Sequence, residues 1–200
     1  MENKLPNRKP TRLRTFDYNS VGAYFITICT QNKQKILSRI VRTGVLDGPR
    51  VELLPCGKIA DKYLHQLNDF YDHITVEHYV IMPNHIHILL LVNEDASGPS
   101  GTPVPTGLCD THGPSGTPVP TDLCDVLGPS GTPVPTLQNS TVSRFVSTFK
   151  RFCNKKYGEN IWQYRSNDHV IRDREDYDRH LKYICENPER WRYDELYTDQ

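Results

Sequence analysis

Three segments of the chain have the apolar pattern and the length of β-strands. Residues 23–30 read AYFITICT, which is rich in β-branched and aromatic side chains. Residues 73–82 and 85–92 have the same character and are separated only by Pro83 and Asn84. A two-residue connection is typical of a tight hairpin, so the sequence predicts that the last two strands pair antiparallel.

Three other segments carry apolar residues at helical spacing and are predicted as helices. The second of these helices, residues 140–157, is expected to end at Gly158. The last one begins with acidic residues, which the helix dipole favours, and Pro188 is expected to end it. Residues 162–171 are predicted as a further strand. The predicted helices are residues 56–67, 140–157 and 173–186.

A repeat interrupts this pattern. From Gly98 the unit GPSGTPVPT recurs with a period of 15 residues, and its third copy stops at Thr136. Such a segment has little to bury and cannot offset its ordering entropy, so residues 96–138 are expected to be a flexible insertion. The insertion separates two halves of one domain, residues 1–95 and 139–200. The elements then follow the order β, α, β, β, α, β, α, which fits an α+β fold with an antiparallel sheet and helices packed on one face.

Charge and cysteine content narrow the class of protein. The 200 residues have a formal net charge of +0, but residues 1–50 hold ten Lys or Arg against three acids. Clustered positive charge can attract a polyanion even when the total is neutral, although a solvated surface would have the same pattern. The six cysteines form no CxxC pair, and no signal peptide or membrane-length apolar run is present. We therefore expect a cytoplasmic protein.

The sequence PNHIHILLL contains the most specific chemical signal. Side chains alternate across a strand, so His85 and His87 are predicted to lie on one face, with Ile86 and Ile88 on the other. Two neighbouring imidazoles on an apolar strand indicate a divalent metal, with a third ligand from elsewhere. The alternative is a pair of ordinary histidines at an exposed sheet edge.

The last predicted helix offers a second set of polar side chains. Asp176, His180, Tyr183 and Asn187 are three or four residues apart and are therefore neighbours on one helix face. A phenol there could act as a nucleophile, with the Asn187 carboxamide oxygen beside it as a metal ligand. The alternative is that Tyr183 only packs its ring at the edge of the core.

Three stretches together resemble the REP-associated tyrosine transposases, which belong to the single-tyrosine HUH transposases. They are HYVIMPNHIHILLLV, IWQYRSNDHVIR and DYDRHLKYICENP, in that order. The resemblance implies a ferredoxin-like antiparallel sheet. It also implies that His85, His87 and Asn187 are metal ligands and that Tyr183 is the nucleophile. Asp168, His169 and Arg172 fall in a recurrent family segment and are expected to have a supporting role; the repeat insertion is not associated with the family.

The implied reaction is cleavage and rejoining of single-stranded DNA hairpins through a 5′-phosphotyrosine, with Mg²⁺ or Mn²⁺ polarising the phosphate. The protein would then be nucleoid-associated, as a monomer or homodimer. A catalytically inactive hairpin-binding regulator and a hydrolytic nuclease remain the alternatives. The residues expected to bind DNA phosphates are Arg12, Arg14, Arg144, Arg151 and Lys155.

Overall fold

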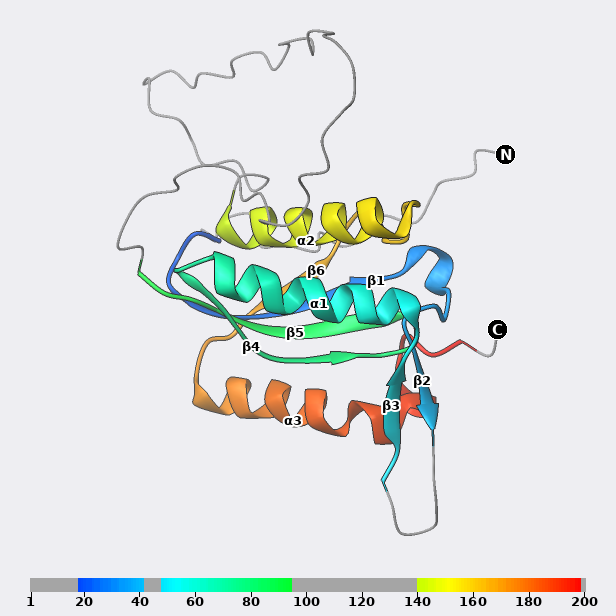
Figure 1. Ribbon diagram of the computed structural model, residues 1–200. Helices are drawn as coiled ribbons and strands as arrows, with labels where there is room; N and C mark the ends of the chain where they lie inside the picture. The colour runs from blue at the N-terminus through cyan, green and yellow to red at the C-terminus, as the bar shows by residue number, and fades with distance from the viewer. Residues whose placement is uncertain (1–17, 42–47, 95–139, 199–200) are drawn as a thin grey trace, which may run out of the picture.

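The computed structural model describes residues 18–41, 48–94 and 140–198 (Figure 1). The predicted insertion and the N-terminal arm with Arg12 and Arg14 lie outside these residues. The described strands are β1 (Gly22–Cys29), β2 (Ser38–Val41), β3 (Arg50–Leu53), β4 (Ile74–Ile81), β5 (His85–Val92) and β6 (Asn167–Val170). The helices are α1 (Pro55–Phe70), α2 (Thr141–Tyr157) and α3 (Arg174–Arg190), with short 3-10 turns η1 (Gln31–Lys33) and η2 (Trp191–Tyr193).

The main sheet has the strand order β4-β5-β1-β6, and each neighbouring pair is antiparallel. Its elements follow the chain order β1, α1, β4, β5, α2, β6, which is the ferredoxin-like β-α-β-β-α-β arrangement. The prediction of an α+β fold with an antiparallel sheet is confirmed. Strands β2 and β3 form a separate hairpin between β1 and α1 that the sequence pattern did not indicate.

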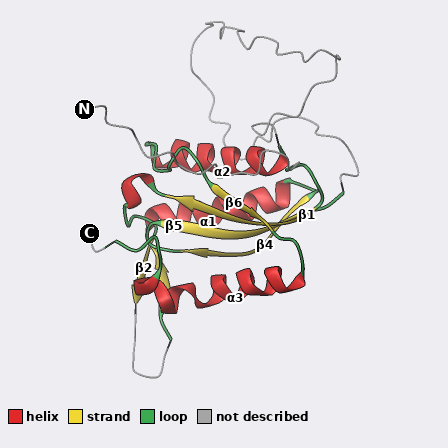
Figure 2. Cartoon of the chain, turned by 180° about the vertical axis from the view of Figure 1, so that it is seen from behind, coloured by secondary structure: helices red, strands yellow, loops and turns green. Residues whose placement is uncertain are grey.

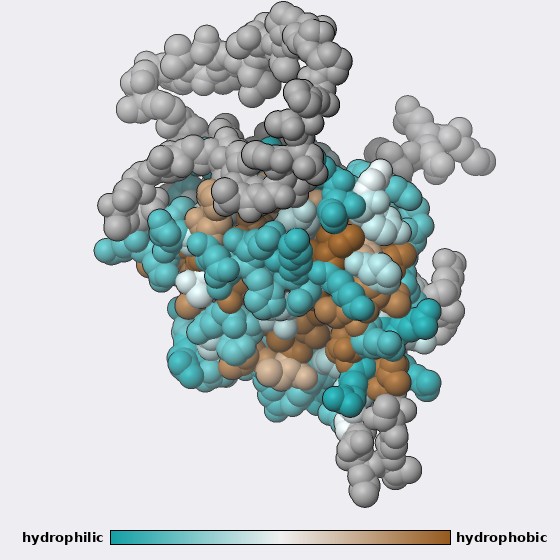
Figure 3. Space-filling view, viewed as in Figure 1, coloured by the Kyte–Doolittle hydropathy of each residue, from teal (hydrophilic) through white to brown (hydrophobic). Residues whose placement is uncertain are grey.

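Helices α1 and α2 cover one face of the main sheet, as Figures 1 and 2 show from opposite sides. The core beneath them is apolar because strand alternation sends one set of side chains from β1 and β5 to this face. In Figure 3 hydrophobic residues reach the surface in patches around α1 and in the band between α1 and α3. The buried members of this core include Ile26, Ile28, Ile86, Ile88, Leu90, Leu64, Phe145 and Phe149.

Helix α3 packs against the opposite face of the sheet and is an addition to the ferredoxin-like core (Figure 1). It departs from the expected one-sided packing because the second face also carries apolar residues. Phe25 of β1, Leu89 of β5 and Ile184 of α3 form a second buried cluster there. This arrangement places α3 directly over the face that carries the two histidines.

The helix ends follow from local chemistry, with one correction. The Asp173 side chain caps α3 by accepting a hydrogen bond from the Asp176 amide at 2.8 Å. Gly158 ends α2 in the left-handed conformation, with φ of 94°. The prediction that Pro188 ends the last helix was wrong, because α3 continues through it to Arg190. Proline removes one helical hydrogen bond, and the burial of Asn187 and Trp191 on either side holds the last turn in place.

The strand predicted over residues 162–171 was also wrong in extent. Only Asn167–Val170 forms a strand, whereas Trp162 contacts Thr30 through an isolated bridge. Between them, Tyr164 is 92% exposed. The polar run after Trp162 lacks the apolar alternation that would keep it in the sheet. Within the described ranges, none of the helices has the length and apolar character needed to cross a membrane.

Candidate functional site

His85 and His87 lie side by side on β5, and their ring centroids are 4.4 Å apart. Strand β5 is central, between β4 and β1, and both side chains are buried. The prediction that the two imidazoles share one face is confirmed. The alternative of histidines at an exposed sheet edge does not hold, because neither residue is exposed and β5 is not an edge strand.

One nitrogen of each imidazole is held by a neighbouring polar side chain. The Nδ1 atom of His85 lies 2.8 Å from Asn84 Oδ1, and the Nδ1 atom of His87 lies 2.9 Å from Thr27 Oγ1. The Nε2 atoms of both rings are buried and have no hydrogen-bond partner among the described residues. A metal-binding histidine has this arrangement, since a partner on one nitrogen orients the ring and leaves the other nitrogen to bind the metal.

Burial keeps both imidazoles neutral. It lowers the pKa of His85 from 6.5 to about 4, and it lowers the pKa of His87 well below its ordinary value, with the neighbouring His85 adding to the effect. Metal binding requires the neutral imidazole, so the environment prepares both side chains for this role without a proton to displace at neutral pH.

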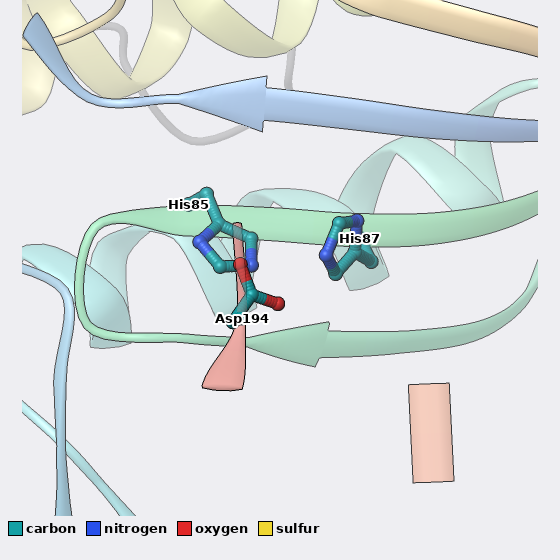
Figure 4. Close-up of side chains that lie close together, drawn as sticks. All are labelled: His85, His87 and Asp194. Carbon is teal, nitrogen blue, oxygen red and sulfur yellow. The ribbon is translucent and has the colours of Figure 1, made fainter. Parts of the chain in front are cut away.

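Asp194 completes the group, and sequence reasoning missed it. The side chain lies beside the two imidazoles (Figure 4), and donor atoms of His85, His87 and Asp194 all lie within 4.8 Å of one another. This group of side chains could hold a divalent metal. Asp194 follows η2, beyond the end of α3, and no periodicity connects it to the histidines. Only the fold of the chain after α3 brings it to β5.

Tyr183 lies at the edge of this group. Its ring centroid is 5.1 Å from that of His87 and 6.0 Å from that of Phe25, and its hydroxyl donates a hydrogen bond to Asp194 Oδ2 at 2.8 Å. The residue is 41% exposed, so the phenol is accessible from outside. Partial burial of this residue, together with the hydrogen bond to the Asp194 carboxylate, raises the pKa of the Tyr183 phenol. The ring of Tyr183 therefore packs at the edge of the core, as the alternative expected. Its hydroxyl, however, also reaches the histidine group through Asp194.

Asn187 lies one turn beyond Tyr183 and is buried. Its Nδ2 atom donates a hydrogen bond to Asp194 Oδ2 at 2.9 Å, whereas its Oδ1 atom is buried without a hydrogen-bond partner among the described residues. The structure thus brings the predicted tyrosine and asparagine to the predicted histidines. It leaves a carboxamide oxygen available in the same group.

Three of the residues expected to bind DNA lie away from this site. Arg144, Arg151 and Lys155 are exposed on α2, which covers the opposite face of the sheet from the histidine pair (Figure 1). The basic face of α2 is therefore not part of the site, and its contact with DNA stays a prediction.

The residues expected to support the site are also separate from it. Asp168 is buried and accepts a hydrogen bond from Ser166 at 2.8 Å. His169 and the Arg172 amide both contact the Asp176 carboxylate instead, at 2.9 and 3.3 Å.

Comparison with known proteins gives limited similarity. No protein family matches the chain. An uncharacterized protein of Haemophilus influenzae is 27% identical over 200 residues, covering 98% of this chain and 96% of that protein. Among solved structures, a REP-associated tyrosine transposase bound to a REP hairpin is similar, with a TM-score of 0.48 and 18% identity, covering 88% of this chain and 73% of that one.

Proposed function

We propose that this chain is a metal-dependent single-tyrosine transposase that cleaves and rejoins single-stranded DNA at hairpin sites through a 5′-phosphotyrosine. One observation carries the proposal: Asp194 accepts hydrogen bonds from the Tyr183 hydroxyl and the Asn187 amide, and it lies in one group with His85 and His87. His85, His87 and Asn187 each also have a buried side-chain atom, Nε2, Nε2 and Oδ1, without a hydrogen-bond partner among the described residues. The motifs that resemble REP-associated tyrosine transposases support it independently.

The donor set fits a divalent cation. Two neutral imidazoles, a carboxamide oxygen and a carboxylate suit an ion such as Mn²⁺, and Mg²⁺ also takes such oxygen ligands. The residues that would hold the ion are His85, His87 and Asn187, with Asp194 as a further oxygen ligand. When bound, such an ion polarises a phosphate oxygen and stabilises the negative charge that develops on it.

The side chains of this site then have separate roles. The Tyr183 oxygen forms a bond to phosphorus, the bond from phosphorus to the 3′ oxygen breaks, and the strand end leaves as a 3′-OH. Asp194 already accepts the phenolic hydrogen bond, so it is placed to take the phenolic proton. The leaving 3′ oxygen takes one proton from water, and Asp194 returns its proton to water, so that no net proton is gained or lost. The reverse reaction rejoins the strands, since the covalent link conserves the bond energy.

The test is capture of a covalent adduct. Protein is incubated with end-labelled single-stranded hairpin DNA and Mn²⁺ and then resolved on a denaturing gel. Tyr183→Phe removes one oxygen and keeps the ring, so adduct and cleavage should both vanish while hairpin binding remains. A hydrolytic nuclease would still cleave in this variant. A non-catalytic hairpin-binding protein would give no adduct even from the wild type.

Two tyrosines provide matched controls. Tyr177 lies on the same helix and donates its hydroxyl hydrogen bond to Glu77 at 2.6 Å, away from the histidines. Tyr164 is the rival nucleophile, since it is almost fully exposed. Adduct should persist in Tyr177→Phe and in Tyr164→Phe. An adduct lost only in Tyr164→Phe would assign the nucleophile to that residue and refute the proposal.

A further inference from the structure

A second group of His and Asp side chains lies at the other end of α3. His169 of β6 places its Nε2 atom 2.9 Å from Asp176 Oδ2, and His180 places its Nδ1 atom 3.2 Å from Asp176 Oδ1. The Asp176 carboxylate is buried, whereas the side chain of His169 is 45% exposed. Donor atoms of the three residues lie within 4.8 Å of one another. A buried carboxylate thus has an imidazole against each oxygen, with access from solvent.

These distances are close to those between neighbouring ligands of one metal ion. A zinc ion binds imidazole nitrogen and carboxylate oxygen at about 2.0–2.2 Å, so two tetrahedral ligands lie roughly 3.3 Å apart. The 2.9 and 3.2 Å distances run to different oxygens of the carboxylate, Oδ2 and Oδ1, so the carboxylate must turn for one oxygen to join both imidazoles around a single ion. The fourth position would face solvent beside His169, which suits a bound water.

This group is separate from the site at His85 and His87. The ring of Phe25 lies between the two, with its centroid 4.6 Å from that of His180 and 5.0 Å from that of His87. An ion bound at Asp176 therefore has its own set of ligands and shares none with the first site.

The chain also contains a matched pair that lacks the third ligand. Asp61 and His65 of α1 have the same spacing of four residues, and His65 Nδ1 lies 2.9 Å from the Asp61 carbonyl oxygen. The equivalent distance from His180 Nδ1 to the Asp176 carbonyl oxygen is 2.8 Å. At Asp61, however, the carboxylate accepts the Tyr79 hydroxyl at 2.6 Å and lies 3.9 Å from the imidazole. An Asp and a His four residues apart on a helix therefore do not make a metal site by themselves. At Asp176, His169 provides the third side chain.

We propose that His169, Asp176 and His180 bind a second divalent cation of the zinc class, which joins β6 to the first turns of α3. Two imidazoles and one carboxylate select Zn²⁺, Co²⁺ or Ni²⁺ over Mg²⁺, which prefers oxygen ligands and retains its water. On binding, the Nδ1 hydrogen bond of His180 to the Asp176 carbonyl is exchanged for a metal–nitrogen bond, and that proton moves to Nε2. The nearby Arg179 guanidinium, 3.6 Å from Asp176 Oδ1, is mostly exposed and free to turn away.

Such an ion would affect the position of α3, the helix that carries Tyr183. Asp176 and Tyr183 are seven residues apart, which is about two turns of the same helix. A bound ion would hold the beginning of α3 against the edge strand and so restrict the helix that presents the phenol. The inference itself does not depend on the proposed function, because binding is measured without DNA.

The experiment counts ions in tag-free protein that has been stripped with a chelator. Co²⁺ and Zn²⁺ are titrated by calorimetry, and the bound metal is quantified by elemental analysis. His169→Ala should lose one ion, with its affinity weakened by more than about tenfold, because even loss of an outer partner costs about 10–100-fold. The matched control His65→Ala should bind as the wild type does. Zn²⁺ should raise the melting temperature of the wild type and of His65→Ala more than that of His169→Ala.

The first site is tested separately by His85→Ala, which should leave the ion at Asp176 in place. A wild type that binds one ion, lost in His169→Ala and kept in His85→Ala, would support this inference while contradicting metal binding at the histidine pair. Equal ion counts and affinities in His169→Ala and the wild type would overturn the inference. If His169→Ala does not fold, Co²⁺-induced shifts of the His169 and His180 ring protons in the wild type decide the question, and unshifted signals refute it.

Discussion

The buried neutral His85 makes the stability of the metal-free protein depend on pH in a window that the structure defines. In the unfolded chain this imidazole takes a proton below its ordinary pKa of 6.5, whereas burial lowers the pKa in the folded protein to about 4. Between these values the unfolded chain binds more protons than the folded one. The stability that the neutral, buried His85 contributes is therefore complete above about pH 6.5 and is lost as the pH is lowered toward 4.

The size of the effect follows from the two pKa values. A difference from 6.5 to about 4 corresponds to roughly 3 kcal/mol, at about 1.4 kcal/mol for each factor of ten. Most of this change, about 2 kcal/mol, should be lost between pH 7 and pH 5. His87 acts in the same direction, because burial also lowers its pKa.

The perturbation that isolates this effect is His85→Asn. Asparagine can keep the donor to Asn84 Oδ1 and cannot take a proton in this range. Urea unfolding of metal-free protein at a series of pH values should show a shallower dependence in this variant than in the wild type. His65→Asn, at an exposed position, should keep the wild-type dependence. Equal slopes in His85→Asn and the wild type would refute the reasoning from burial.

Two further outcomes are expected. Asp194→Asn removes the charge beside the histidines and the proton acceptor of Tyr183, so calorimetry should show Mn²⁺ affinity falling by more than about tenfold, with slower adduct formation. The exposed Glu189→Gln should change neither the affinity nor the adduct. Wild-type affinity and adduct formation in Asp194→Asn would exclude both roles. Gly57→Ala would place a Cβ atom 2.0 Å from the Leu37 carbonyl oxygen, so the free energy of unfolding should fall by about 1–3 kcal/mol in urea. Gly48→Ala, with nothing within 4 Å, is the control, and equal stability of the two variants would contradict the packing at Gly57.

The strong apolar patterns were enough to predict an α+β fold with an antiparallel sheet, whereas the ferredoxin-like arrangement was implied by the family resemblance. Strand β5 was predicted with its observed bounds, because its apolar run is bounded by a clear turn at Pro83 and Asn84. The β2–β3 hairpin could not be predicted, since each strand has only four residues and no member is deeply buried apart from Ser38. The second-face position of α3 also escaped prediction. Helical periodicity shows that a helix has an apolar side but not which face of a sheet it covers.

The candidate site likewise contains residues that the sequence could predict and residues that it could not. Residues on regular elements could be predicted, because strand alternation pairs His85 with His87 and helical spacing pairs Tyr183 with Asn187. Asp194 lies after α3 in a segment without periodicity, so only the three-dimensional path of the chain brings its carboxylate to the imidazoles. The separation of the basic face of α2 from the site has a similar origin. It depends on which face of the sheet each helix covers.

The pairing of β1 with β5 determines which nitrogen of His87 is free. In this register Thr27 lies opposite His87, and its hydroxyl occupies the Nδ1 side of the ring. A shift by one residue would send both imidazoles into the apolar core beneath α1 and α2, because side chains alternate along a strand. The pairing of the strands in the sheet therefore sets the orientation of the imidazoles. Tyr183, Asn187 and Asp194 belong to the segment that docks on its second face. Because α3 reaches that face through Phe25, Leu89 and Ile184, loosening this small cluster should separate the phenol from the histidines while the larger core remains intact.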